Sequence, residues 1–159
     1  MATPAGGRAF PRTRFRIIGT GQLDQLLTEP PPNVEHVAWV NYERLPDELH
    51  TADCALGVFG TSEKAGRVIP NKAFQALACG VPLITADTPA ARELLVDQES
   101  ALLVPPGDAE ALASAVRRLA ADPALAQRLA DGGLHAYRTH ASERVLGERW
   151  RGLIEQLVH

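Results

Sequence analysis

The stretch 57–92 constrains the fold of this chain more than any other. It opens at the end of one apolar run, 54–59, and continues through a polar loop, a helix-like segment, 71–79, and a second apolar run, 81–85. Parallel strands are joined by helical crossovers of this kind, and runs that are apolar throughout indicate a sheet covered on both faces. Three further strand-like runs follow the same alternation: 15–18, 34–40, whose apolar end is 37–40, and 101–104. The sequence therefore predicts an α/β fold with a Rossmann-like, doubly wound parallel sheet.

Polar residues in front of helix-like segments mark where helices should begin. We expect helix caps at Thr88, Asp108, Asp122 and Ser142. The pair Gly132-Gly133 should weaken or end the helix that Asp122 starts, because glycine is a poor helix former. The last helix should carry an apolar face formed by Leu146, Trp150, Leu153 and Leu157.

Length and composition restrict the class of protein. A chain of 159 residues suits one domain, which we expect at 14–159, preceded by a disordered tail at 1–13 that is rich in Ala, Gly and Pro. A net charge of -3 and an aromatic content of 5% argue against nucleic-acid binding. The two cysteines, Cys54 and Cys79, lie in apolar runs and should be buried free thiols; no metal-ligand spacing is present. With neither a membrane-length apolar run nor a signal peptide, the sequence favours the cytoplasm.

The loop 60–70 and the start of the helix after it form the best candidate for a binding site. Pro70 keeps the residue before it extended, and Asn71 is expected to cap the helix. The first turn then presents free N–H groups and the positive end of the helix dipole, close to the charges of Arg67 and Lys72. Such an arrangement binds anions, most simply a phosphate. The alternative is an ordinary turn with solvated charges, since neither the Gly-x-Gly-x-x-Gly nor the Gly-Lys-Ser/Thr phosphate motif is present.

A glycine turn, Gly19-Thr20-Gly21, follows the first apolar run and precedes a helix-like segment, 22–27. Open α/β sheets bind ligands at the carboxyl ends of their strands, where this turn would lie. A turn that serves packing alone explains the same residues.

Several segments, taken together, resemble a known domain. They are 15–21, 33–40, 70–84, 92–95 and 101–108. In order and spacing they resemble the C-terminal, donor-binding domain of GT-B glycosyltransferases of the group 1, or family 4, type, from about Arg14 to the end of the chain. The resemblance implies that the domain binds a nucleotide-diphosphate sugar at the carboxyl ends of its strands.

The resemblance also implies where the donor would lie. The loop 59–70 and the helix start at Asn71 would hold the diphosphate and the sugar, and the loop after Val40 would lie by the base. Where the family commonly has two glutamates for sugar and ribose hydroxyls, this chain has Arg67 and Gln75. Gln75 could bind a hydroxyl without a carboxylate's strength, and Arg67 could pair with a phosphate. The expected substrate-binding residues are Gly19, Gly21, Val40, Asn41, Gly60, Thr61, Arg67, Asn71, Lys72 and Gln75.

The implied reaction moves a sugar from a nucleotide-diphosphate sugar to a hydroxyl acceptor, with retention of configuration and with neither cofactor nor metal. No residue stands out as a catalytic base. The family's N-terminal acceptor domain is not represented, so the resemblance implies an N-terminally truncated half that is inactive alone and whose last helix, with Trp150, packs toward the missing part. Membrane contact is expected only through the full-length enzyme, and no nucleic-acid partner is expected. The alternatives are a non-catalytic nucleotide-sugar-binding or interaction module and an unrelated doubly wound protein.

Overall fold

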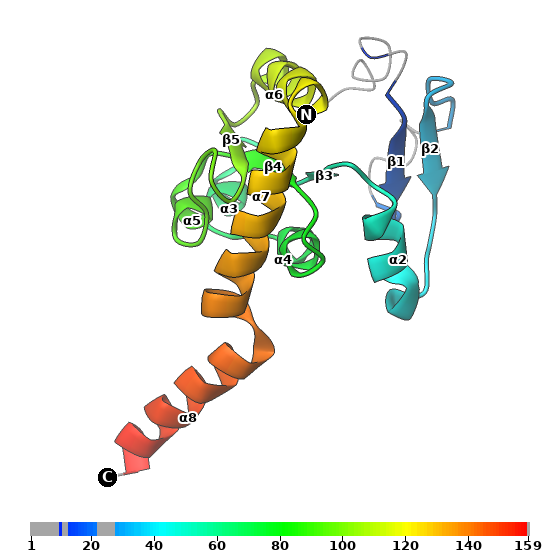
Figure 1. Ribbon diagram of the computed structural model, residues 1–159. Helices are drawn as coiled ribbons and strands as arrows, with labels where there is room; N and C mark the ends of the chain where they lie inside the picture. Colours follow the sequence, from blue (N-terminus) through cyan, green and yellow to red (C-terminus); the bar gives the residue numbers. More distant parts are fainter. Residues whose placement is uncertain (1–9, 11–12, 22–27, 159) are drawn as a thin grey trace. The chain divides into compact units, whose positions relative to one another are not determined.

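The computed structural model describes residues 10, 13–21 and 28–158, and the chain divides into two compact units, Met1–Glu48 and Leu49–His159 (Figure 1). The segment 22–27, expected to be helical, lies outside the described residues, as does most of the tail expected at 1–13.

The first unit contains a short parallel ladder. Strands β1 (Phe15–Ile18) and β2 (Val34–Val37) pair in parallel along their whole length. The side-chain amide of Asn33 donates hydrogen bonds of 2.8 Å to the carbonyls of Phe10 and Thr13. These bonds attach the described part of the N-terminal segment to the ladder.

Strand β2 is shorter than the sequence predicts. The run 34–40 was expected to be strand throughout, but β2 ends at Val37. The carbonyl of Val37 accepts a 3.0 Å hydrogen bond from the N–H of Gly19. Beyond that point β1 offers no further residues to pair with, so the ladder stops, and Trp39 is 75% exposed. A 3-10 turn, η2 (Tyr42–Arg44), and helix α2 (Leu45–His50) follow.

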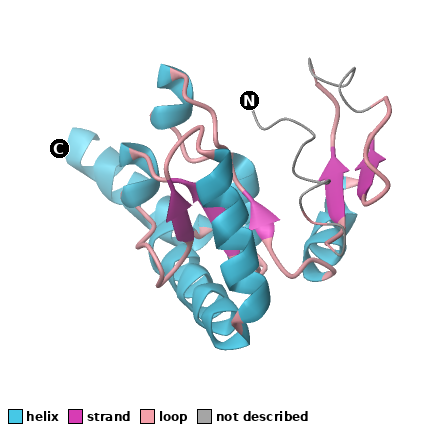
Figure 2. Cartoon of the chain, turned by 90° about the horizontal axis from the view of Figure 1, so that it is seen from above, coloured by secondary structure: helices cyan, strands magenta, loops and turns pink. Residues whose placement is uncertain are grey.

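The second unit is built on a three-stranded parallel sheet. Strands β3 (Ala55–Leu56), β4 (Leu83–Ala86) and β5 (Leu102–Val104) lie in the order β3-β4-β5. Its helices are α3 (Glu63–Gly66), α4 (Asn71–Ala78), α5 (Pro89–Arg92), α6 (Ala109–Ala121), α7 (Pro123–Ala136) and α8 (Glu143–Val158), with a π-type turn η3 (Tyr137–Ala141) before α8. Parallel pairing and alternating helices confirm the Rossmann-like α/β class (Figure 2).

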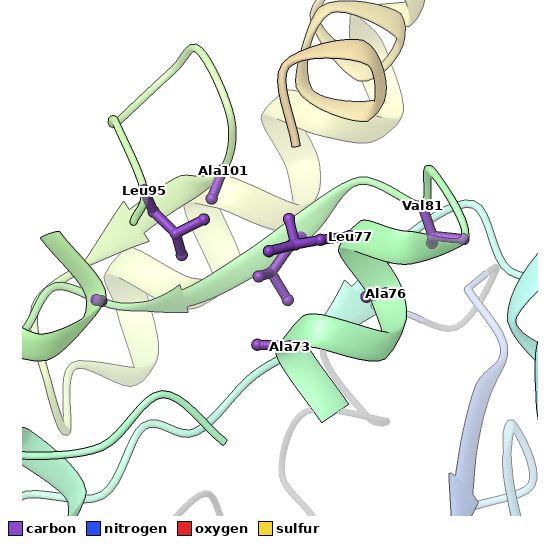
Figure 3. Packing of buried hydrophobic residues seen from close by; sticks show 8 residues of the cluster. Ala73, Ala76, Leu77, Val81, Leu95 and Ala101 are labelled. Carbon is purple, nitrogen blue, oxygen red and sulfur yellow. The ribbon is translucent and has the colours of Figure 1, made fainter. Parts of the chain in front are cut away.

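Strand β4 is buried on both faces because helices cover both sides of it. Leu83 packs in one apolar cluster with Ala73 and Leu77 of α4. Its neighbour Ile84, whose side chain points to the opposite face, packs in a second cluster with Leu129 of α7. Figure 3 shows the first cluster, with the side chains of α4 packed against the sheet. The core therefore fixes α4 against the centre of the sheet.

Three of the four expected helix caps are present. The side-chain oxygens of Thr88, Asp108 and Asp122 accept hydrogen bonds of 3.1, 2.9 and 2.9 Å from the N–H groups three residues on. The fourth expectation is wrong in its detail, because the hydroxyl of Ser142 donates to the carbonyl of Arg138 instead of capping α8. Residue 142 still has the extended backbone that precedes a helix.

The glycine pair in α7 does not end the helix, which continues to Ala136. A Cβ atom on Gly132 would collide with the backbone of Glu99, and one on Gly133 would lie 2.8 Å from a methyl group of Leu77 and 3.1 Å from the carbonyl oxygen of Ser100. The prediction was wrong because the two glycines are needed for packing. Without Cβ atoms, they let α7 lie close to the backbone of Glu99 and Ser100, which precede β5.

Helix α8 carries an exposed apolar face. None of its residues is buried, and Trp150 is 65% exposed. The other large apolar side chains exposed on α8 are Leu146, Leu153, Ile154, Leu157 and Val158. Figure 1 shows α8 extending away from α7. Within the described residues, no helix has the length and apolar character needed to cross a membrane.

Gly132→Ala tests the close approach of α7. We expect the free energy of unfolding to fall by about 1–3 kcal/mol, because backbone atoms of residues 99 and 100 would have to move. Gly147→Ala in α8 is the matched control: a Cβ there meets nothing within 4 Å, so alanine should be neutral or stabilising. Urea unfolding followed by circular dichroism measures both. Equal stability of the two variants would contradict the packing role of Gly132.

Candidate functional site

The first turn of α4 has unsatisfied backbone donors. Pro70, not Asn71, is the capping residue, with φ -71° and ψ 149°, and it has no side-chain oxygen that could accept a hydrogen bond. Its carbonyl accepts the N–H of Ala73 at 2.9 Å. Among the described residues, the N–H groups of Asn71 and Lys72 have no hydrogen-bond partner. The expectation that Asn71 caps the helix was wrong, but the free amides that it was meant to explain are present.

Lys72 belongs to the same first turn, and its ammonium has no counter-ion among the described residues. Although the residue as a whole is exposed, the surrounding protein removes part of the water around its ammonium, and this desolvation lowers the pKa of Lys72. A partly desolvated cation without a partner is well suited to meet an anion.

Arg67, the second expected cation, is paired within the protein. Its guanidinium donates to the carboxylate of Glu63 one helical turn earlier, and both side chains are largely exposed. Glu63 belongs to α3, where the hydroxyl of Ser62 accepts the N–H of Ala65 at 3.2 Å. Glu63 was not among the expected site residues, although its spacing of four from Arg67 is the sequence signal that predicts such a pair.

The loop after β3 is held against the turn after β5. The N–H of Gly107 donates to the carbonyl of Phe59 at 2.9 Å. Gly107 has a φ of +75°, and a Cβ on it would lie 2.7 Å from the methyl group of Thr61. Gly60 is half-buried, Thr61 is exposed, and both precede α3. These two expected site residues therefore lie at the carboxyl edge of the sheet, as the prediction requires.

Gln75 lies one turn into α4, three residues after Lys72, and is half-buried. Its side-chain amide makes no hydrogen bond within the described part of the chain, so it is available to a ligand hydroxyl. A small internal cavity of about 10 Å³ lies behind the first turn, between Ala65, Pro70, Ala73 and Thr88. That volume suits about one water, so a donor would have to bind on the outer surface of this turn.

Four expected site residues belong to the first unit. Gly19 follows β1 with a φ of +117°, and its carbonyl lies 2.8 Å from the ring Nε2 of His36. Gly21 is exposed. Val40 and Asn41 follow β2, and the side-chain oxygen of Asn41 accepts the N–H of Glu43 at 3.1 Å. All four come after the carboxyl ends of the parallel strands β1 and β2, while the other six belong to the second unit.

Neither cysteine has the character of a nucleophile. Both are free and only half-exposed. Burial, helped by the charge of Asp53, raises the pKa of Cys54 to about 12, and burial also raises the pKa of Cys79. In the part of the chain that the structure describes, no group of three or more His, Cys, Asp or Glu side chains is placed to bind a metal ion.

The thiol of Cys54 should be almost inert in the native protein. At pH 8 a pKa of about 12 leaves on the order of 10⁻⁴ of the thiol ionised, against about a quarter in an unfolded chain. In a Cys79→Ser variant, which leaves Cys54 as the one cysteine of the chain, we expect labelling by Ellman's reagent to be roughly a thousandfold slower than in urea. Comparable rates in the two conditions would contradict the burial of this thiol.

Comparisons with known proteins identify the family of this chain. The chain belongs to the family of group 1 glycosyl transferases, whose family model matches residues 5–122. The phosphatidyl-myo-inositol mannosyltransferase of Mycobacterium leprae is 31% identical to it over 144 residues, which make up 87% of this chain and 37% of that protein.

Two solved structures show the same fold. The sucrose-phosphate synthase of Thermosynechococcus elongatus has a TM-score of 0.78 and 23% identity, covering 98% of this chain and 41% of that one. The Anabaena protein Alr3699/HepE, solved in complex with UDP-glucose, has a TM-score of 0.78 and 16% identity, covering 97% and 44%. The chain therefore spans less than half the length of these relatives.

Proposed function

We propose that the first turn of α4 binds the diphosphate of a nucleotide-diphosphate sugar, and that this chain is the donor-binding part of a glycosyltransferase that transfers the sugar to a hydroxyl acceptor. The observation that carries the proposal is the pair of unsatisfied N–H groups at Asn71 and Lys72, on a helix turn whose lysine has no ion pair among the described residues. Membership of the group 1 family and the UDP-glucose complex of the Anabaena relative support it.

The same groups would stabilise the leaving diphosphate. When the bond between the anomeric carbon and the phosphate oxygen breaks, negative charge develops on that oxygen. Fixed amides and the Lys72 ammonium, placed before the reaction begins, stabilise such charge without reorganising. Catalysis without a metal is part of this proposal. Retention of configuration at the transferred carbon is also part of it and rests on the resemblance alone.

The remaining expected site residues have roles in the same proposal. Gln75 would bind a hydroxyl of the sugar or ribose, and Gly60 and Thr61 would let the donor approach the loop after β3. The assignment of Val40 and Asn41 to the base, and of Gly19 and Gly21 to the donor site, rests on the resemblance alone. The two free cysteines suit a reducing compartment, so we include a cytoplasmic location.

The acceptor half of the enzyme would be supplied by a further part of the protein. The relatives are more than twice as long as the matched region. Helix α8, whose apolar face around Trp150 is exposed, is the element we assign to contact with that half. On this proposal the present chain binds the donor but does not turn it over alone.

A non-catalytic nucleotide-sugar-binding module is the second candidate. It is favoured by the replacement of two acidic side chains by Arg67 and Gln75, and by the pairing of Arg67 with Glu63 in the protein itself. Sugar transfer by the full-length protein separates the two candidates, because a module binds donor without consuming it.

Calorimetric titration with UDP-, GDP- and ADP-sugars tests the binding site. One of them should bind, and Lys72→Ala should weaken it about 10- to 100-fold, as expected for a lost charge-assisted phosphate contact. The affinity for the corresponding nucleoside, which has no phosphate, should not change. Arg151→Ala removes an exposed charge from α8, away from this helix start, and should have a much smaller effect. Absence of binding by all three sugars to a folded sample, or equal losses for nucleotide and nucleoside, would contradict the site.

The pH dependence of donor binding should follow Lys72. Its pKa is lowered, so the ammonium loses its charge at a lower pH than an ordinary lysine. As the pH is raised, the affinity of the wild-type chain should begin to fall below the pH at which an ordinary lysine loses its charge. Lys72→Arg should remove the decline, because a guanidinium does not titrate in the range where a lysine does. A decline of the same size in both proteins would show that another group is responsible.

A further inference from the structure

We propose that Glu63 controls how much negative charge the site accepts. By holding Arg67 in an ion pair at the edge of the site, it favours a nucleotide-diphosphate sugar over the free nucleoside diphosphate that sugar transfer leaves behind. The inference rests on the proposed function, because it concerns the same anion site.

The ion pair lies close to the first turn of α4. Arg67 precedes Asn71 by four residues, so their Cα atoms are at most about 14 Å apart. Ala65 of α3 and Ala73 of α4 line the same small cavity, together with Pro70. Helix α3, which carries Glu63, is therefore a neighbour of the helix start that carries the free amides.

The four charged side chains near this site, Glu63, Lys64, Arg67 and Lys72, give it a net positive charge. Glu63 neutralises Arg67, while Lys64 and Lys72 have no ion pair among the described residues. The site in its resting form thus offers two cations and a neutral pair rather than three cations and no carboxylate. Exposed pairs of this kind are weak, so the pair contributes through its charges and not through the stability it adds.

Sugar transfer changes the charge of the ligand. A nucleotide-diphosphate sugar is a diester with a charge of about -2, and the terminal phosphate of the free nucleoside diphosphate adds a further negative charge near neutral pH, for a total of about -3. The transferred sugar exchanges its bond to the phosphate oxygen for a bond to the acceptor oxygen, and the acceptor hydroxyl gives up its proton. A nearby carboxylate therefore acts more strongly against the product than against the donor.

Glu63→Gln should tighten binding, and more so for the more highly charged ligand. A unit charge at about 12 Å changes affinity about twofold for each ligand charge, which gives about fourfold for UDP-glucose and about eightfold for UDP. Arg67→Gln should weaken both ligands by similar factors, and Glu63→Gln with Arg67→Gln should bring both within twofold of the wild type. The changes should shrink at high salt, because ionic strength screens exposed charges.

The experiment measures the dissociation constants of UDP, UDP-glucose and inorganic pyrophosphate by calorimetry at low and high salt. Glu148→Gln is the matched control, because Glu148 pairs with Arg144 at the same spacing of four on the exposed helix α8. It should leave all three affinities unchanged.

The outcomes distinguish this inference from the proposed function. An unchanged ratio of UDP to UDP-glucose affinity in Glu63→Gln would overturn the inference while leaving a donor site in place. A double variant as weak as Arg67→Gln would also overturn it, since Arg67 would then contact the phosphate directly. If neither nucleotide binds but Glu63→Gln still tightens pyrophosphate binding, the charge control stands and the nucleotide function fails.

Discussion

Helix α4 is fixed by burial along one face and left open at its first turn. Ala73, Ala76 and Leu77 are within 1% of complete burial, so the helix cannot shift to satisfy its first amides elsewhere. Pro70 sets the entry into the helix but offers no side-chain acceptor. The unsatisfied amides are therefore a consequence of packing, and a helix start held in this way favours negative charge. The proposed anion site depends on this combination of a buried helix face and an uncapped first turn.

Other contacts in the second unit hold the turns at the two ends of the parallel sheet. Asp87 and Arg92 form a two-point ion pair of 2.6 and 2.7 Å across the turn from β4 into α5, and this contact with the guanidinium holds the pKa of Asp87 below its usual value. The turn before β5 is bound by two arginines, since Arg118 donates to the side chain of Gln98 and Arg128 to its carbonyl. These contacts fix the turns on either side of the sheet, while the charges next to α4 stay free or exposed.

In the proposed site, the backbone and the charged side chains near α4 would contribute to anion binding in different ways. The free amides and the helix dipole attract any phosphate, whatever the total charge of the ligand. The side chains then determine the net charge near the helix start: Arg67 is paired with Glu63, while Lys72 has no ion pair among the described residues. If the proposed donor site is correct, its ligand gains charge during sugar transfer, and that balance would bear on release of the product as well as on binding of the donor.

Much of the local structure could be predicted from the sequence, because its causes lie within a few residues. The alternation of apolar runs and helices, the caps at Thr88, Asp108 and Asp122, and the loop before α4 all follow from propensity and hydrogen bonding along the chain. The tertiary structure alone decided where β2 ends, since a ladder stops with its partner strand, and that α7 continues through Gly132, since the residue approaches a distant backbone. It also decided that Lys72 has no ion pair among the described residues, because such pairs depend on which side chains meet in space, whereas the pairing of Arg67 with Glu63 follows from their spacing of four in the sequence.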